Sequence, residues 1–332
     1  MDRSKFCQAA FKSNKTAEAN AFRLCFEIRS FVKDPGNSET RKSFLKYADR
    51  LLQILKREHK LSKSEDFKEK IAGAFKQDSI LIFTLTNITV FSLDDCQDLF
   101  MIFLLSIERT LEKHIIDNID TISTLLVTPV SSLDLDLMCG QFFRDLIQNS
   151  NLCQAFLKVK VFDQLVKLAG SEVFELSSDA CTSLRALLDN SDASAFINSH
   201  PIHILKGLYR LCDSGYYVKR MSLSLIYSIL KSNNNKQFAE FFVGNQENLK
   251  YAMNLMKEDE SVEVKIDGFF LFAQITMIVF AQTSRSEMLS YRIIRKNKER
   301  IVKYLEKFQN YRDDGNFQTE KRKILEILSA VD

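Results

Sequence analysis

A row of polar and aromatic side chains follows Gly215 on one face of a predicted helix. The row advances in steps of four, four and three residues: Tyr216, Arg220, Ser224 and Tyr227. This spacing places the four side chains on one side of an α-helix. An arginine fork between aromatic rings suits a partner's carboxylate or backbone carbonyls, so the row is a candidate protein contact. Taken alone, the spacing is more typical of a solvated helix face.

The remaining reactive and metal-binding side chains do not form a recognisable catalytic or ligand-binding motif. The sequence holds no phosphate-binding loop, no dinucleotide fingerprint and no serine nucleophile elbow. His200 and His203 lie three positions apart, but no second ligand pair accompanies them, so helix capping or solvation is the better interpretation. The run 313–316 lacks the alternating ligands of a calcium loop. We therefore predict a protein that is not an enzyme and has no cofactor or metal.

A basic segment near the C-terminus offers a different function. Residues 285–303 carry many cations: Arg285, Arg292, Arg295, Lys296, Lys298, Arg300 and Lys303. They are candidates for binding nucleic acid or the acidic tail of a partner. However, Glu287 and Glu299 interleave with them, and the whole chain has a net charge of only +3. A solvated face or an acidic-peptide site is therefore favoured over nucleic acid.

Composition favours long helices and an intracellular location. Only 9 glycines and 3 prolines occur in 332 residues, while 45% of residues are hydrophobic. The seven cysteines show no C-x-x-C spacing, and the N-terminus lacks an apolar signal region, so we expect reduced thiols in a cytoplasmic protein. The longest apolar runs, 99–107 and 269–281, are shorter than the roughly 20 residues that span a bilayer, and they predict buried helices rather than membrane contact.

Hydrophobic spacing and breaker residues predict the individual helices. A turn is expected over 34–38, and the locally ambiguous stretch 80–91 is interpreted as helical with a turn near Asn87. Thr128-Pro129 is expected to end the helical pattern before it. Further helices are predicted over residues 21–33, 41–60, 99–111, 153–168, 202–211 and 317–331.

A repeat runs through the second half of the chain. Small residues recur at separations of 41, 42 and 46, namely Cys139, Ala180, Ser222 and Gly268. Apolar residues follow each of them at the fourth and seventh positions. This period is that of armadillo and HEAT repeats, in which a small residue allows close helix approach. We predict a right-handed armadillo/HEAT-like α-solenoid forming one domain over residues 1–332, with the repeat clearest over 133–331 and residues 1–95 helical without a clear copy.

Several stretches resemble the calcium-binding protein 39 family of armadillo-like kinase scaffolds. The resemblance covers roughly residues 95–330 and rests on these groups: Cys139-Gly140 with Arg144, Phe174 to Ala180 with Leu187-Leu188, Tyr216 with Lys219-Arg220 and Ser222-Leu223, Glu247 to Lys250 with Met253 and Leu255, and Leu305 to Asn310 with Arg312, Phe317, Glu320 and Lys321. It implies a scaffold without catalysis. The concave face of such a scaffold would bind and allosterically activate sterile-20-class protein kinases or a related pseudokinase.

The resemblance also assigns the residues that would meet the partner. Phe174, Tyr216 and Arg220 match the family's concave contact site, so partner contact becomes the favoured reading of the row above. Met253 and Lys296 match a pocket for a Trp-Glu-Phe peptide tail. The chain departs from the family at Ser224, where a lysine is usual, and at Asn233 and Lys236, which replace an arginine and a phenylalanine. These departures put the strength and the peptide preference of binding in question.

Overall fold

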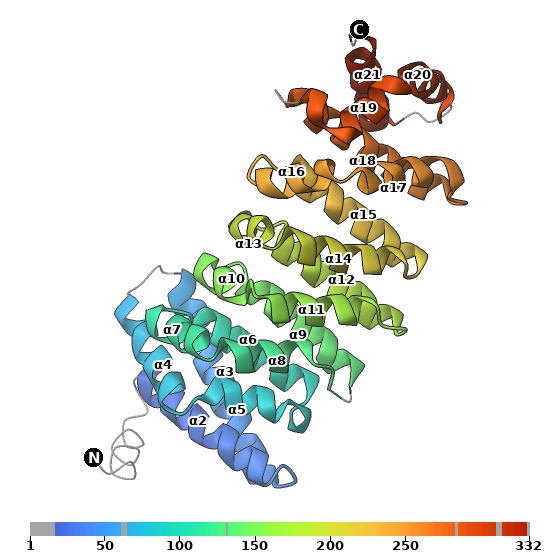
Figure 1. The fold of residues 1–332 in the computed structure, drawn as a ribbon. Helices are drawn as coiled ribbons and strands as arrows, with labels where there is room; N and C mark the ends of the chain where they lie inside the picture. Colours follow the sequence, from blue (N-terminus) through green and yellow to red (C-terminus); the bar gives the residue numbers. More distant parts are fainter. Residues whose placement is uncertain (1–16, 61–64, 131, 283–284, 310–313, 331–332) are drawn as a thin grey trace. The chain divides into compact units, whose positions relative to one another are not determined.

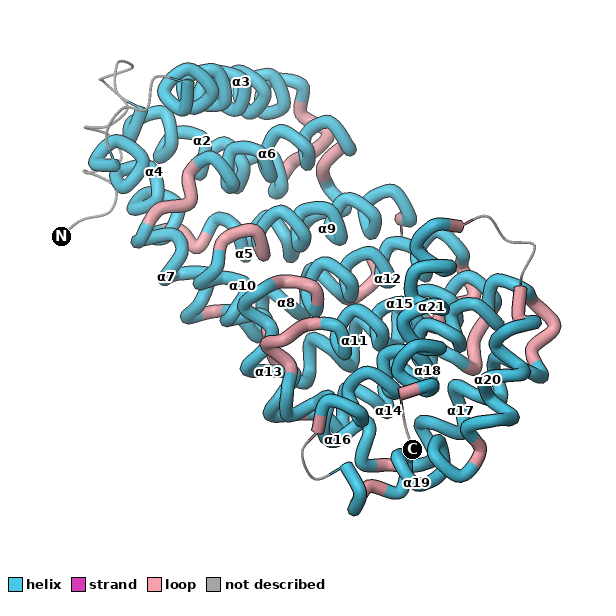
Figure 2. The backbone as a smooth tube through the Cα atoms, turned by 90° about the horizontal axis from the view of Figure 1, so that it is seen from above, coloured by secondary structure: helices cyan, strands magenta, loops and turns pink. Residues whose placement is uncertain are grey.

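The computed structural model describes residues 17–60, 65–130, 132–282, 285–309 and 314–330, and all regular structure within them is helical (Figures 1 and 2). The chain forms two compact units that meet in sequence at Leu187 and Leu188, and each is described by itself. The all-α class of stacked helical repeats is thereby confirmed. The single domain over residues 1–332 stays a prediction.

The first unit is a stack of short and medium helices. Its helices are α2 (Ala17–Lys33), α3 (Ser38–Lys60), α4 (Glu65–Gln77), α5 (Ile80–Thr86), η1 (Ile88–Val90), α6 (Leu93–Leu105), α7 (Arg109–Asp117), α8 (Ile119–Val127), α9 (Leu133–Leu146), α10 (Ser150–Phe156), α11 (Val159–Ala169) and α12 (Phe174–Leu188). Helix α3 packs between α2 and α6, and α9 packs on α6 and α8. Buried phenylalanines fill the seams, as where Phe100 stacks on Phe142 with ring centroids 4.1 Å apart.

The second unit is organised around one apolar helix. Its helices are η2 (Ser191–Ala193), α13 (Ser194–Ser199), α14 (Pro201–Cys212), α15 (Tyr216–Lys231), α16 (Lys236–Gly244), α17 (Gln246–Glu258), α18 (Val262–Ala281), η3 (Arg285–Glu287), α19 (Leu289–Lys296), α20 (Lys298–Lys307) and α21 (Gly315–Ser329). Helix α18 contacts α15, α16, α17, α19 and α21. By length and composition α18 resembles a membrane span, but buried residues run along its whole length and neighbouring helices cover it, which explains its apolar character.

Small residues lie at close helix contacts, as the repeat predicts. A methyl group added to Gly268 on α18 would lie 2.7 Å from the Cβ atom of Leu255 and 3.1 Å from the amide nitrogen of Met256 on α17. Ser222 on α15 is buried and donates a hydrogen bond of 2.6 Å to the carbonyl oxygen of Leu208 on α14. Cys139 and Ala180 are likewise buried.

Helix boundaries agree with the sequence where a breaker residue marks them. The 34–38 turn, the stop at Thr128 and the helix starting after Gly215 are confirmed, and the helix over 80–91 ends at Asn87 before a short 3-10 turn. Two predictions are wrong. Residues 99–111 are not one helix, because α6 ends at Leu105 and α7 begins at Arg109, and residues 153–168 divide into α10 and α11 at Leu157.

Candidate functional site

Helix α15 separates a buried face from an exposed row. Gly215 precedes the helix, and Ser222, Leu223, Ile226, Ile229 and Leu230 are all buried, as predicted. On the other side, Tyr216 is 55% exposed and Arg220 is half-buried. The row begins where the helix begins, so its first turns are available to a partner.

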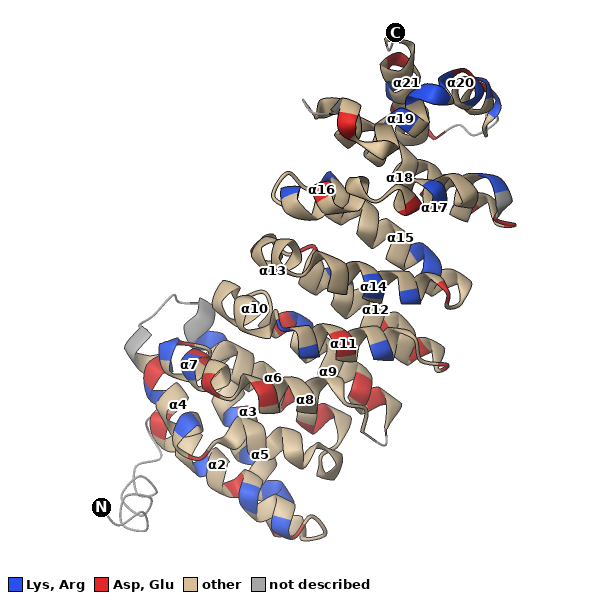
Figure 3. Ribbon diagram, viewed as in Figure 1, with Lys and Arg blue, Asp and Glu red and all other residues tan. Residues whose placement is uncertain are grey.

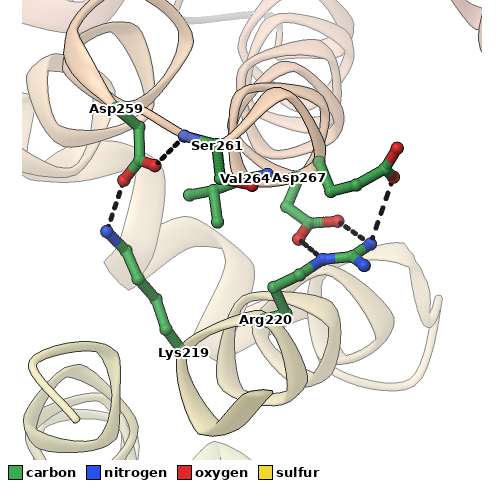
Figure 4. A network of polar contacts seen from close by, with 7 residues as sticks. Lys219, Arg220, Asp259, Ser261, Val264 and Asp267 are labelled. Carbon is green, nitrogen blue, oxygen red and sulfur yellow. Dashed lines mark hydrogen bonds and ion pairs between the residues drawn. The ribbon is translucent and has the colours of Figure 1, made fainter. Parts of the chain in front are cut away.

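Arg220 is held by two carboxylates of α18. Its Nε atom donates to Asp267 at 2.8 Å, and its Nη2 atom lies 3.4 Å from the second carboxylate oxygen of Asp267 (Figure 4). The Nη2 atom also lies 3.6 Å from a carboxylate oxygen of Glu263. The hydrogen bond that Arg220 donates to Asp267 is the main cause that raises the pKa of Arg220, so this side chain remains protonated. Arg220 is therefore outside the core, as predicted, but it is also a tie between α15 and α18.

A second ion pair stands beside the first. Lys219 Nζ lies 2.5 Å from a carboxylate oxygen of Asp259, which also accepts from the amide of Ser261 (Figure 4). Partial burial alone would raise the pKa of Asp259, but the bonds from Lys219 and Ser261 outweigh it and lower the pKa. The two cations in the first turns of α15, Lys219 and Arg220, are thus fixed by the segment that leads into and begins α18.

Tyr216 and Arg220 come together, whereas Tyr227 lies elsewhere on the helix. The guanidinium carbon of Arg220 lies 5.9 Å from the ring centroid of Tyr216. Tyr227 packs against Phe270 of α18 with ring centroids 5.5 Å apart. Phe174, the first residue of α12, is 63% exposed and belongs to the first unit. Its convergence with the other two residues stays a prediction.

One of the two residues predicted for the peptide site, Met253, lines a pocket of the second unit. A pocket of about 220 Å³ is lined by eight residues of the second unit: Met253, Met256, Lys257, Phe272, Asn297, Arg300, Ile301 and Tyr304. Sulfur-containing and aliphatic side chains form much of its wall, and the charged side chains that line it are cationic. Tyr304 closes one side by donating a hydrogen bond of 2.7 Å to the carbonyl oxygen of Met256.

Lys296 lies next to this pocket rather than in its wall. It lines a neighbouring hollow that shares Asn297 and Arg300 with the first pocket. Among the described residues, neither Lys296 nor Arg300 forms an ion pair, so both ammonium and guanidinium groups are available to an acidic ligand. Asn233 and Lys236 are exposed, and neither lines either of these two hollows. We therefore expect their substitution to affect the pocket only indirectly.

The basic segment forms a charged surface at the end of the second unit. Figure 3 shows Lys and Arg gathered over α19 and α20. Glu299 lines the same hollow as Lys296, Lys298 and Arg300, so the positive surface is interrupted, as the sequence indicated.

His200 and the described cysteines lie against packed side chains. His200 precedes α14, its ring contacts Phe196, and no group of metal-binding side chains occurs in the part of the chain that is described. The six described cysteines are free and buried, and burial raises the pKa of Cys139 to about 12, whereas Cys7 lies outside the described residues. Such thiols are unreactive at neutral pH.

Sequence reasoning missed the carboxylates that hold Arg220. A signal for one of them, Asp267, exists in the repeat, because Asp179 and Asp267 each directly precede a small anchor residue, Ala180 and Gly268. In the first unit Asp179 pairs with Arg144 of α9 at 2.7 Å, which is the same kind of arginine–aspartate tie between helices.

Three known proteins are each 26% identical to this chain over the residues that align. The dee76 protein of Auxenochlorella protothecoides is 26% identical over 324 residues, covering 91% of this chain and 99% of that protein. Human calcium-binding protein 39-like is 26% identical over 208 residues, 61% of this chain and 60% of that protein. A Mo25-like protein of Schizosaccharomyces pombe is 26% identical over 234 residues, 67% of this chain and 69% of that protein.

These similarities agree with the stacked helices of both units and indicate a helical scaffold protein. They also confirm the resemblance stated from the sequence. The pattern that defines the Mo25-like family matches residues 9–331, so this chain belongs to the Mo25-like family.

Proposed function

We propose that this protein is a non-catalytic cytoplasmic scaffold that binds sterile-20-class protein kinases or a related pseudokinase and favours their active conformation. Tyr216 and Arg220 would contact the partner together with Phe174. A scaffold that binds the active arrangement more tightly than the inactive one shifts the population toward it. This mechanism needs a binding surface but no catalytic group.

The observation that carries the proposal is the pocket beside α20. Its apolar wall, formed in part by Met253, Met256 and Ile301, fits an aromatic side chain, since methionine adapts its shape to a ring. Arg300 and the adjacent Lys296 supply cations for an acidic residue next to that ring. This combination suits a hydrophobic-acidic peptide such as a Trp-Glu-Phe tail.

A fluorescent peptide ending in Trp-Glu-Phe tests the pocket directly. We expect saturable binding to the wild-type chain, weakened by roughly tenfold or more in Met253→Ala. Met101→Ala, which truncates an exposed methionine of α6, is the matched control and should bind as wild type does. Equal binding by Met253→Ala and wild type would remove Met253 from the site.

The alternative function is nucleic-acid binding, and a steep loss of affinity with added salt would distinguish it. If residues 285–303 bound nucleic acid, affinity for a single-stranded oligonucleotide would fall steeply as salt rises. The glutamates in the segment argue against it, so we expect weak oligonucleotide binding compared with the acidic peptide.

A further inference from the structure

Arg220 is one cation facing two carboxylates. Asp267 holds it at 2.8 Å and Glu263 approaches it at 3.6 Å, so the three side chains together carry a charge of −1. The Asp267 side chain is 13% exposed, whereas those of Glu263 and Arg220 are 37% and 36% exposed. The carboxylate that holds Arg220 most closely is therefore the most buried of the three groups.

The Asp267 carboxylate fixes the orientation of the guanidinium. It meets the edge formed by Nε and Nη2, and neither ion pair uses Nη1 (Figure 4). A guanidinium held along one edge has a planar, pre-organised opposite edge for further donation. Less rotational entropy is then lost when that edge binds a partner.

We infer that Asp267 is a positioning residue for the partner site, and that the partner presents an uncharged acceptor to Arg220, a main-chain carbonyl or a hydroxyl, rather than a carboxylate. This inference rests on the proposed function. A partner carboxylate would have to compete with Asp267 for the same cation and would stand beside Glu263 as a like charge. An uncharged oxygen accepts from Nη1 without either conflict.

Three substitutions in the full chain test this inference. The probe is a purified sterile-20-class kinase domain that binds the wild-type chain. We expect Asp267→Asn to weaken binding about tenfold, which corresponds to about 1.4 kcal/mol. Asp267→Glu keeps the charge and should recover part of the affinity. Glu263→Gln should change the dissociation constant less than about twofold, because an uncharged partner group gains little from removal of that charge.

Asp259→Asn is the matched control. It removes the partner of Lys219, at 15% exposure against 13% for Asp267, and leaves Arg220 untouched. If Asp267 served only to stabilise the fold, both asparagine variants would lower the melting temperature and neither would affect kinase affinity. We expect the two asparagine variants to melt at similar temperatures. Only Asp267→Asn should lose affinity for the kinase domain.

Two results would overturn the inference while leaving the proposed function standing. Unchanged or tighter binding by Asp267→Asn would show that Asp267 does not position Arg220 for the partner. Tighter binding by Glu263→Gln would show that the partner presents a carboxylate. If no sterile-20-class kinase domain binds the wild-type chain, the proposed function itself fails and this inference fails with it.

Discussion

The Nε atom of Arg220 on α15 lies 2.8 Å from a carboxylate oxygen of Asp267 on α18, so the residue proposed to meet a partner also ties two helices together. A solvated arginine would be neutral for stability. An arginine bonded to a nearly buried carboxylate does contribute to stability. Any experiment on Arg220 must therefore separate its contribution to stability from its contribution to partner binding.

Truncation of Arg220 should destabilise the protein modestly. We expect Arg220→Ala to lower the free energy of unfolding by about 1 kcal/mol, because it breaks a charge-assisted hydrogen bond that is partly screened by solvent. The corresponding fall in melting temperature is about 3 °C. Arg210→Ala is the control, since Arg210 on α14 is exposed and its side chain forms no hydrogen bond or ion pair with the described residues. Equal melting of the two variants would mean that the Asp267 bond contributes nothing to stability.

Gly268 should not tolerate even a methyl group. Its added Cβ atom would meet α17 at 2.7 Å from Leu255 and 3.1 Å from a backbone nitrogen, which cannot move aside as a flexible side chain can. We expect Gly268→Ala to cost about 2 kcal/mol by chemical denaturation, despite alanine's better helix propensity.

Gly73→Ala gives the opposite expectation. Gly73 lies inside α4, and apart from its chain neighbours and the backbone of its own helix no described atom lies within 4 Å of the position its Cβ would take. Alanine should therefore stabilise the protein by about 0.5–1 kcal/mol. Stabilisation of both Gly73→Ala and Gly268→Ala would contradict the close approach of α17 and α18.

His114 should make the protein less stable in mild acid. Burial, reinforced by Lys76, lowers the pKa of this histidine below its ordinary value of 6.5, and its Nε2 atom is buried without a hydrogen-bond partner in the described residues. The unfolded state then binds a proton more readily than the folded state. Stability should fall as the pH drops below about 6.5 and continue to fall until the folded-state pKa is reached.

Denaturant unfolding at a series of pH values checks this expectation. His114→Gln removes the titrating group and should flatten the stability profile between pH 6.5 and 5 relative to wild type. An unchanged slope in His114→Gln would assign the acid sensitivity to other groups.

The sequence predicted the elements that repeat and missed those that depend on local backbone turns. Ser222 and Gly268 sit at helix contacts because the fold requires a small side chain at that step, and periodicity reveals such a requirement. The breaks at Ser106 and Leu157 carry no glycine or proline, and hydrophobic residues continue through them, so the pattern appeared unbroken.

The candidate site was predicted only in part, because helical spacing reveals neighbours on one helix and not contacts between helices. The row on α15 follows from helical spacing, and Tyr216 and Arg220 do come together. Asp267 was missed because it lies 47 residues away, and pairing across successive repeats is not visible along one helix. Met253 lines the pocket, whereas Lys296 lies just outside it, because the chain turns at Asn297 between α19 and α20.

Kinase activation measures the central claim most directly. A purified sterile-20-class kinase domain is assayed for substrate phosphorylation with increasing amounts of wild type, Arg220→Ala or Arg210→Ala, at a temperature where all three are folded. We expect wild type and Arg210→Ala to raise the rate equally. Arg220→Ala should need about 30-fold more protein for the same rate, which corresponds to about 2 kcal/mol. Full activation by Arg220→Ala at wild-type concentrations, or no activation by wild type in any kinase of the class, would contradict the account.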